Sequence, residues 1–164
     1  MQGVSRWFRT YGFAEVDDGL VAGAYPLDAD DVDVLASLSV NHVLNLARDD
    51  EYRPGQHEAV AAAYAATGIG ERRLGVTDYG HLPPELLEAA VTTIVGWLEQ
   101  PSGTAYVHCR AGWQRSAAVA AGVVAIREGL EIGDALDAVR RRKPSADPLP
   151  HQVRDLRTWW DARS

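Results

Sequence analysis

Apolar residues along the chain gather in two kinds of block, and the two kinds alternate. Short apolar runs closed by turn-forming residues predict buried strands, at 20–24, 42–46, 72–76 and 104–107. Longer segments with helical spacing or helical propensity fall near 35–38, over 58–66 and from 84 to just before 101. Three further helices are expected at 117–126, 132–142 and 150–162.

Residues with special backbone preferences mark the ends of two of these helices. Asp30 or Asp31 is a candidate N-cap for the helix near 35–38, because a carboxylate there accepts hydrogen bonds from free N–H groups. Gly129 ends the segment 117–126, as is common at helix C-termini. That segment is apolar on every side, so it predicts a central, buried helix.

The order of strands and helices predicts the α/β class. Strands that alternate with helices usually form a parallel sheet with helices packed on it. We therefore expect a single-domain sandwich over residues 1–164, with a central, largely parallel sheet flanked by helices. The 164 residues suffice for one buried core, and no repeat or linker divides the chain.

Composition and charge narrow the classes of partner. Apolar residues make up 46% of the chain and charged residues 24%, as in ordinary globular proteins. The formal charge of -7 disfavours nucleic acid as the main partner, because proteins that track its phosphates carry excess Lys and Arg. The longest apolar stretch is too short to span a membrane, and no secretory signal begins the sequence. We therefore expect a cytoplasmic protein without a transmembrane segment.

The cysteine and histidine content argues against metals and disulfides. Cys109 is the single cysteine, which excludes an internal disulfide and a four-cysteine zinc site. The five histidines show no zinc-site spacing, and His57-Glu58 lacks the second histidine of the H-E-x-x-H motif. We expect neither a metal nor a cofactor.

Two other groups of residues have simple structural interpretations. The basic run 140–143 ends a predicted helix, and we favour a role in complementing the helix dipole over one in binding a membrane or an acidic substrate. Lys143 is the single lysine among 16 basic residues, which we interpret as a coding bias. Trp97, Trp159 and Trp160 lie on amphipathic helices and are expected in or near the core.

One loop carries the candidate chemistry. It joins the strand 104–107 to the buried helix and reads His108-Cys109-Arg110-Ala111-Gly112-Trp113-Gln114-Arg115-Ser116. A helix N-terminus favours an anion, because its N–H groups lack intrahelical partners and the macrodipole is positive there. We expect residues 110–115 to bind phosphate. Gly112 permits a turn that gathers N–H groups, and Arg115 offers a planar fork for two phosphate oxygens.

Cys109, at the start of this cradle, is the candidate nucleophile. A thiol at a helix N-terminus ionises readily, so we expect a thiolate at neutral pH. The thiolate would attack phosphorus and form a phosphocysteine intermediate. Ser116 is placed to donate a hydrogen bond to the sulfur and so assist its departure when water attacks.

A second loop offers a general acid for the leaving group. Asp78 lies just past a predicted strand and is flanked by Gly75 and Gly80, so it belongs to a segment that can fold over a cleft. His81 and Glu85 are the nearby alternatives.

The motif H-C-x-A-G-x-x-R-S resembles the signature of the protein tyrosine phosphatase superfamily, specifically its small dual-specificity branch. The likeness extends over nearly the whole chain, since 23–26 and 43–46 resemble the opening strands of that branch. The resemblance implies an α/β sandwich in which Cys109 is the nucleophile, Asp78 the acid and then the base, and Arg115 the phosphate clamp. It also implies that Ser116 assists thiolate departure, and His108 is counted as a supporting residue.

Part of the sequence is similar to the members of that branch that act on phosphatidylglycerophosphate or phosphoinositides. The similarity rests on Asn45-Leu46, on Glu51-Tyr52 and on Asp78 with the later Leu82-Pro83. Glu51 and Tyr52 are therefore candidates for the substrate site, and a solvated loop is the alternative. Trp113 departs from the pattern, because the lipid-phosphate enzymes often carry a small or basic residue there.

Three functions follow as hypotheses. The leading one is a phosphatase of phosphotyrosine, and also of phosphoserine and phosphothreonine, in proteins. The second is the same chemistry on a phospholipid or a small phosphorylated metabolite. The third is a non-catalytic phosphate-binding module, which the combination of Cys109, Asp78 and Arg115 disfavours. An arsenate reductase is also disfavoured, since such enzymes generally need further cysteines.

Overall fold

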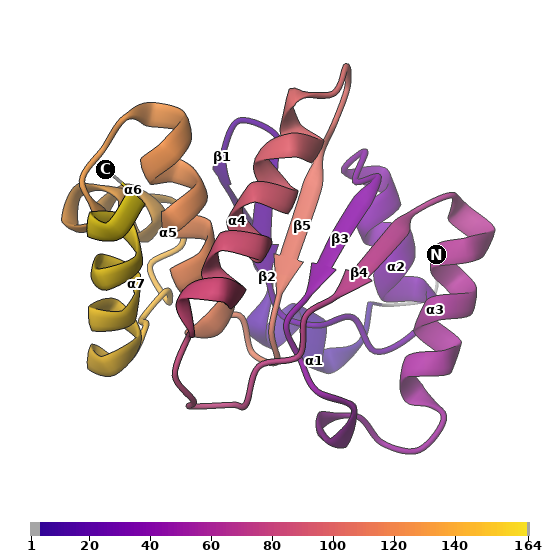
Figure 1. Cartoon of the computed structure of the whole chain (residues 1–164). Helices are drawn as coiled ribbons and strands as arrows, with labels where there is room; N and C mark the ends of the chain where they lie inside the picture. Colours follow the sequence, from indigo (N-terminus) through magenta and orange to yellow (C-terminus); the bar gives the residue numbers. More distant parts are fainter. Residues whose placement is uncertain (1–3, 164) are drawn as a thin grey trace.

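A five-stranded sheet forms the centre of the molecule, with the strand order β1-β2-β5-β3-β4 (Figure 1). Its strands are β1 (Phe13–Asp17), β2 (Leu20–Gly23), β3 (His42–Asn45), β4 (Gly70–Arg73) and β5 (Ala105–His108). Strands β2, β5, β3 and β4 are parallel, and β1 pairs antiparallel with β2. This computed structural model describes residues 4–163; residues 1–3 and 164, which complete the predicted domain 1–164, lie outside the described residues.

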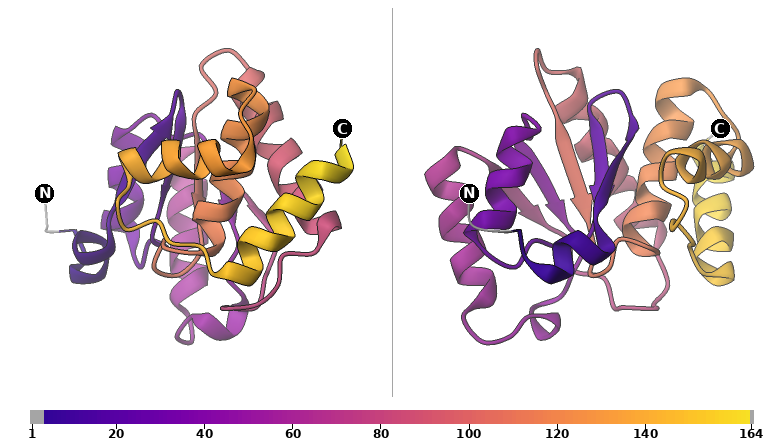
Figure 2. Two further views of the ribbon diagram at one scale, coloured as in Figure 1. Left: turned by 90° about the vertical axis from the view of Figure 1, so that its left-hand side faces the viewer. Right: turned by 180° about the vertical axis from the view of Figure 1, so that it is seen from behind.

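Helices cover both faces of this sheet. They are α1 (Arg6–Tyr11), α2 (Ala29–Ser37), α3 (Gln56–Thr67), α4 (Pro84–Glu99), α5 (Arg115–Glu128), α6 (Ile132–Arg142) and α7 (Pro150–Arg163), with the short 3-10 helix η1 (Asp49–Glu51). Helices α1 to α3 lie on one side and α4 to α7 on the other, as the rear view in Figure 2 shows. The predicted α/β sandwich with a largely parallel sheet is confirmed, and the chain is a single α/β domain.

Each face of the sheet has its own hydrophobic core because side chains alternate along a strand. Val21, Val43 and Tyr106 pack toward α1, α2 and α3. Leu44 and Val107 belong to the larger core on the other face, which holds most of α5. Because of this alternation, the central strands contribute side chains to both cores.

Helix α5 lies at the centre of the larger core, as its apolar sequence predicts. Residues 115–125 are all buried in it. Small side chains permit this close packing: at Gly122, an added Cβ would lie 2.9 Å from Val91 and 3.3 Å from Trp159. Trp159 is buried, and Trp97 and Trp160 pack partly buried against the same core, which confirms the expectation for the three tryptophans. Within residues 4–163, no helix is both long and apolar enough to cross a membrane.

The predicted N-cap of α2, Asp30 or Asp31, was wrong by two or three positions. Asp28 is the N-cap, and its side chain accepts a hydrogen bond from the N–H of Asp31. Asp31 is fully buried and binds elsewhere, because its carboxylate accepts hydrogen bonds from Ser5 N, Ser5 Oγ and Leu27 N. Asp31 therefore joins α1 to α2, a role that its position in the sequence did not indicate.

Two strands differ from the sequence-based expectation. The strand predicted at 72–76 lies at Gly70–Arg73, because pairing with β3 sets its register and its residues are mostly exposed at the sheet edge. Strand β1 and helix α1 were not predicted. Helix α1 has only six residues, and it is held by the side chain of Ser5, which accepts a hydrogen bond from Phe8 N.

The loops that carry the predicted chemistry meet at one edge of the sheet. The carboxyl ends of the parallel strands β5, β3 and β4 point to the lower edge of Figure 1. Ligand sites of open α/β sheets are usually formed at this edge. The basic run 140–142 occupies the last turn of α6, as predicted.

Candidate active site

The loop between β5 and α5 forms a tight cradle around Cys109. Cys109 is buried, with 3% of its surface exposed. Gly112 has a φ of 81°, and a Cβ atom at this position would overlap the backbone of Gly23. The carbonyl of Arg110 accepts a hydrogen bond from Tyr25 N at 3.0 Å. The loop can therefore approach the end of β2 only because residue 112 has no side chain.

The backbone of the loop is held through its carbonyl groups, which leaves its N–H groups available. The carbonyl of Trp113 accepts a hydrogen bond from Asp147 N at 2.6 Å. In the part of the chain that the structure describes, the N–H groups of residues 110–114 donate no hydrogen bond to another backbone group. Several free N–H groups at a helix N-terminus form a site for an anion such as phosphate.

Arg115 lies beneath this loop and is clamped by a carboxylate. Its Nη2 and Nη1 atoms lie 2.6 Å and 2.8 Å from Oε1 and Oε2 of Glu51. The Glu51 carboxylate is itself held by the N–H of Arg48 at 2.7 Å. Burial alone would lower the pKa of Arg115, but hydrogen bonding to Glu51 and the charges of Cys109, Glu51 and Asp78 raise it. The Arg115 guanidinium is therefore positively charged and held in one orientation.

The other edge of the Arg115 guanidinium points to a ligand. Its Nε atom is buried and has no hydrogen-bond partner among residues 4–163. Nη2 lies 3.2 Å from Oδ1 of Asp78. A buried N–H group without a partner is rare in proteins. Because Glu51 occupies the Nη1–Nη2 edge, the Nε–Nη2 edge is suited to two oxygens of one phosphate.

Ser116 lies directly behind the sulfur of Cys109. Its Oγ atom is 3.3 Å from Sγ, and the side chain is fully buried. At this distance the Ser116 hydroxyl can donate a hydrogen bond to the sulfur. The predicted pairing of these two residues is present in the structure.

His108 supports the loop from the sheet side without adding charge. Burial lowers the pKa of His108 to about 4, although its bond to the Cys109 backbone opposes this shift. The ring is therefore neutral at pH 7, and its Nδ1–H donates to the carbonyl oxygen of Cys109 at 3.0 Å. This bond orients the peptide group between Cys109 and Arg110.

Glu51 and Tyr52 have different surroundings, although they are neighbours in sequence. Glu51 is 9% exposed in its side chain and binds Arg115, so the solvated-loop alternative does not describe it. The Tyr52 hydroxyl accepts a hydrogen bond from Asn45 Nδ2 at 2.8 Å, and its ring packs 4.9 Å from that of Tyr25. Tyr52 therefore lies behind Glu51, and it lines neither cavity beside Cys109 and Asp78.

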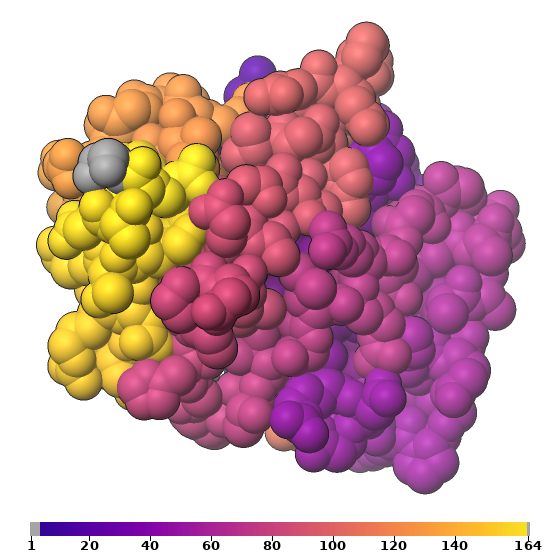
Figure 3. Space-filling view, viewed as in Figure 1, coloured from indigo at the N-terminus to yellow at the C-terminus, as the bar shows by residue number. Residues whose placement is uncertain are grey.

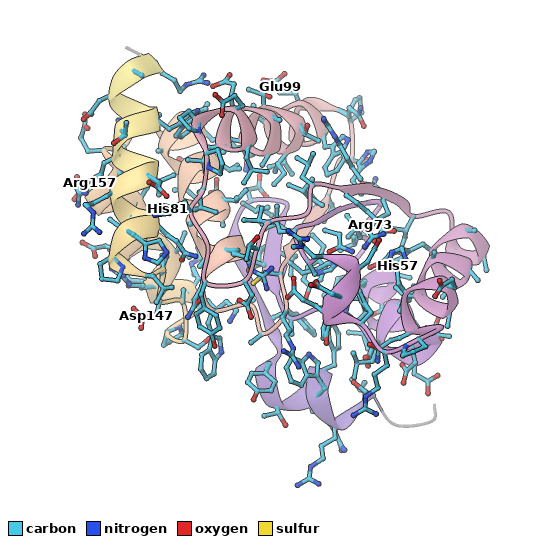
Figure 4. The ribbon with its side chains drawn as sticks, turned by 60° about the horizontal axis from the view of Figure 1, so that its bottom comes forward. His57, Arg73, His81, Glu99, Asp147 and Arg157 are labelled. Atoms are coloured by element: carbon cyan, nitrogen blue, oxygen red, sulfur yellow. The ribbon has the colours of Figure 1, made fainter. Side chains whose placement is uncertain are left out.

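Asp78 is the one of the three candidate acids that lines the cavity of Cys109. His81 turns away and pairs with Asp155 of α7 at 3.0 Å. Glu85 lies in the first turn of α4 and lines none of the cavities around Cys109. In Figure 4, which brings this edge forward, His81 lies beside α7.

Side chains of α7 hold the segment that carries Asp78. His151 Nε2 lies 2.8 Å from the carbonyl oxygen of Tyr79, and Gln152 Nε2 donates to the carbonyl oxygen of Gly80 at 3.1 Å. The carboxylate of Asp155 accepts a hydrogen bond from Leu82 N at 2.8 Å. Figure 3 shows this segment, around residue 80, against the atoms of α7.

Aromatic side chains form one wall of the cavity, which has a volume of about 300 Å³. Trp7 and Tyr11 come from α1, Tyr79 follows Asp78, and Trp113 belongs to the cysteine loop. Tyr79 and Trp113 are 64% and 44% exposed, so they stand at the rim. Trp7 and Tyr11 were missed by sequence reasoning, although their spacing of four residues between Ser5 and a glycine was a detectable helix signal.

Charged side chains line a second cavity, which shares Asp78 and Arg110 with the first. Arg48, Glu51, Asp78 and Arg110 line this cavity, whose volume is about 480 Å³. Arg48 Nη1 donates to Thr77 Oγ1 at 3.2 Å, which connects this cavity to the segment of Asp78. Among residues 4–163, no group of three or more His, Cys, Asp and Glu side chains is arranged to hold a metal ion.

Comparison with known proteins identifies one family. The family model described as "Dual specificity phosphatase, catalytic domain" matches residues 23–162. Dual specificity protein phosphatase 19 of Mus musculus is 28% identical to this chain over 131 residues, which are 80% of this chain and 54% of that protein. The chain thus spans about half the length of the curated relative that it matches.

Solved structures share the fold. The crystal structure of PTPMT1 in complex with PI(5)P has a TM-score of 0.79 and 20% identity, and the match covers 92% of this chain and 95% of that one. The structure of human DUSP28 has a TM-score of 0.71 and 25% identity, with 92% and 94% covered. The likeness to PTPMT1, at this identity, concerns the fold alone.

Proposed function

The chain belongs to the dual specificity phosphatase family, and on that premise we propose that it hydrolyses phosphate monoesters through a phosphocysteine on Cys109. The observation that carries the proposal is the Arg115 guanidinium. One edge is bound by Glu51, and the other, with the buried Nε, opens beside Cys109 and Asp78. This arrangement supports a phosphate held between the arginine and the free N–H groups of the loop.

In the first step, the Cys109 thiolate attacks phosphorus and forms an S–P bond while the P–O bond to the leaving group breaks. Asp78 donates its proton to the departing oxygen. The contact between Asp78 and Arg115 supports this role, because the carboxyl group lies beside the bound phosphate.

In the second step, the Asp78 carboxylate takes a proton from water, whose oxygen attacks phosphorus. The S–P bond breaks, inorganic phosphate leaves, and Asp78 is again protonated. The Ser116 hydroxyl donates a hydrogen bond to the sulfur as it regains its negative charge. This bond lowers the barrier to departure of the thiolate, since it is strongest when the sulfur is charged.

For the substrate, we propose an aryl phosphate, namely phosphotyrosine in proteins. Trp7, Tyr11 and Trp113 provide ring faces and edges along the cavity, and aromatic pairs add stabilisation beyond burial. The rings of Tyr11 and Trp113 lie 5.5 Å apart, so they form one continuous surface. Phosphoserine and phosphothreonine lack a ring to occupy this wall.

A phosphorylated lipid head group is the second candidate. Arg48 and Arg110 support it, because two cations in the charged cavity could contact a further phosphate next to the one bound by Arg115. Asp50 lines the same cavity and lies 3.8 Å from Arg48, so this phosphate would compete with a carboxylate. PTPMT1, which has the same fold, has been solved with PI(5)P. The two candidates thus use two adjoining cavities, which share Asp78 and Arg110.

The test compares purified wild-type protein with Cys109→Ser on four substrates: a phosphotyrosyl peptide, a phosphoseryl peptide, a phosphoinositide and phosphatidylglycerophosphate. We expect wild-type turnover to be fastest on the phosphotyrosyl peptide and unaffected by EDTA. Cys109→Ser should lose turnover but still bind vanadate, since the N–H groups remain. Turnover by Cys109→Ser would refute the phosphocysteine mechanism, and preference for either lipid would refute the aryl substrate.

A further inference from the structure

Tyr79 adopts a backbone conformation that few side chains tolerate. Its φ is 61°, in the left-handed region that glycine enters freely and that a bulky residue rarely occupies. Among residues 4–163, two further residues other than glycine have positive φ, Ser39 and Ser102, and both are small and lie in exposed turns. Tyr79 is thus the one bulky residue of the described chain with this conformation.

The conformation belongs to a tight turn that carries Asp78. The carbonyl oxygen of Thr77 accepts a hydrogen bond from Gly80 N at 2.8 Å, so Asp78 and Tyr79 are the two central residues of the turn. Positive φ at the second central position favours glycine, which forms such a turn without steric strain. A tyrosine therefore stands where glycine would be less strained.

Packing within the fold does not account for the tyrosine. Its surface is 64% exposed, more than that of any other large hydrophobic residue among residues 4–163. A ring that stays in water contributes little to stability. Helix α7 holds the turn through backbone carbonyls, since His151 Nε2 lies 2.8 Å from Tyr79 O and Gln152 Nε2 donates to Gly80 O. These contacts explain how the strained turn persists, but any residue at position 79 could make them.

The tyrosine ring stands at the cavity in which a substrate would bind. Tyr79 lines the cavity of Cys109, and it directly follows Asp78, whose Oδ1 accepts a hydrogen bond from Tyr79 N at 3.1 Å. If Asp78 protonates the leaving-group oxygen, the residue next to it lies beside the organic part of the substrate. Strained backbone conformations persist mainly at functional sites, and this position fits that rule.

We propose that Tyr79 is a specificity-determining residue of this site, whose ring packs against the aryl group of the substrate. The inference rests on the proposed function, because it places a phosphate between Arg115 and the cysteine loop. Aromatic rings attract each other in offset or edge-to-face arrangements. A phosphorylated serine or threonine presents no ring to Tyr79, so the contact favours phosphotyrosine. The strained turn thus serves selectivity rather than the stability of the fold.

The test separates the ring from the backbone conformation. Tyr79→Gly removes the ring and relieves the strain, Tyr79→Asn removes the ring but tolerates positive φ, and Tyr79→Phe keeps the ring. Ser102→Gly is the matched control, because it relieves the same conformation in an exposed turn that lines neither cavity beside Cys109. We measure the melting temperature and kcat/KM on a phosphotyrosyl peptide, on p-nitrophenyl phosphate and on a phosphoseryl peptide of matched sequence.

We expect kcat/KM of Tyr79→Gly and Tyr79→Asn to fall by roughly tenfold on both aryl phosphates, and much less on the phosphoseryl peptide. Tyr79→Phe should recover most of this loss. Tyr79→Gly and Ser102→Gly should melt at or above the wild-type temperature, because glycine adopts positive φ without strain. Equal losses on aryl and alkyl phosphates would overturn the proposal. A lower melting temperature in Tyr79→Gly that Ser102→Gly does not share would also overturn it, since the ring would then serve the fold.

The activated substrate distinguishes a contact with the ring from an effect through Asp78. Variants that only displaced the acid would lose rate on the two peptides, whose leaving groups need a proton, and would keep their rate on p-nitrophenyl phosphate. That pattern would assign Tyr79 to the acid and contradict a contact with the aryl group.

A binding measurement separates this inference from the proposed function. In the Cys109→Ser background, titration calorimetry compares phenyl phosphate with inorganic phosphate. Adding Tyr79→Asn should weaken the binding of phenyl phosphate by roughly tenfold and change that of inorganic phosphate much less. Equal affinity for phenyl phosphate with and without the ring would refute the role of Tyr79. A wild-type protein without turnover, in which this ring effect is present, would contradict only the proposed function.

Discussion

The two halves of the candidate active site are held in place by different means. Cys109, Gly112 and Arg115 of the cysteine loop are buried. The backbone of the loop is bonded just past the ends of β2 and β3 through the carbonyls of Arg110 and His108. The segment of Asp78 is largely exposed, and it is anchored by His151 and Gln152, more than 70 positions away in sequence. We infer that the phosphate-binding half is preformed, whereas the acid half depends on the position of α7.

The largest effect is expected from replacing Arg115, the arginine of the preformed, phosphate-binding half. Arg115→Lys keeps the charge but loses the two-oxygen fork and the bidentate bond with Glu51. We expect kcat to fall by roughly 10³- to 10⁵-fold, the scale at which an arginine supports phosphoryl transfer. Arg127→Lys, at a distant ion pair with Asp17, is the control. A rate within a few fold of the wild type would mean that Arg115 does not hold the phosphate.

The second-largest effect is expected from a change in the acid half alone. In Asp78→Asn the cradle is intact but the proton donor is gone, so hydrolysis of phosphates with poor leaving groups should slow by roughly 10²- to 10⁴-fold. Activated aryl phosphates need little protonation and should slow much less. The alkaline limb of the pH–rate profile should flatten, because no acid then has to remain protonated.

Equal slowing of both substrate classes, with the alkaline limb retained, would assign the acid to another residue. Glu85→Gln and His81→Asn are the variants to compare next. His81 follows Asp78 in the same loop and Glu85 lies in the first turn of α4, but neither lines the cavity of Cys109.

The smallest effect is expected from removing a hydrogen bond that holds the segment of Asp78 against α7. Gln152 is fully buried, and Gln152→Ala removes its bond to the carbonyl of Gly80. We expect a loss of about tenfold with poor leaving groups, since small displacements of a catalytic group have large kinetic costs. Arg154→Ala, on an exposed face of the same helix, should have no effect.

A double-variant cycle gives the decisive readout for this last comparison. If Gln152 acts through Asp78, then Gln152→Ala should add little to Asp78→Asn. Additive losses in the double variant would show that Gln152 affects stability or binding instead of the acid.

The sequence predicted the features of the fold and of the site that depend on residues close together along the chain. Cys109, Arg115 and Ser116 lie within eight positions on one strand–loop–helix unit, so the local pattern identified both the loop and its helix. The alternation of strands and helices predicted the sheet, and it missed only the short, irregular β1 and the exact position of the polar edge strand β4.

Other features depend on pairs that are distant in sequence. Glu51 and Arg115 are 64 positions apart, and nothing in the residues 48–55 distinguished a buried ion pair from a solvated loop. The burial of Lys143 depends on how the segment after α6 packs on the cysteine loop. Such pairings are set by the tertiary fold, which periodicity does not describe.

Part of the aromatic wall comes from outside the family match. Trp7 and Tyr11 precede residue 23, where the match begins, and α1 is attached to the rest of the protein by the bonds between Ser5 and Asp31. By contrast, Trp113 belongs to the cysteine loop and Tyr79 follows Asp78. On the proposed function, evolution could therefore alter the aromatic side chains of α1, and with them the substrates accepted, while Cys109, Asp78 and Arg115 stay unchanged.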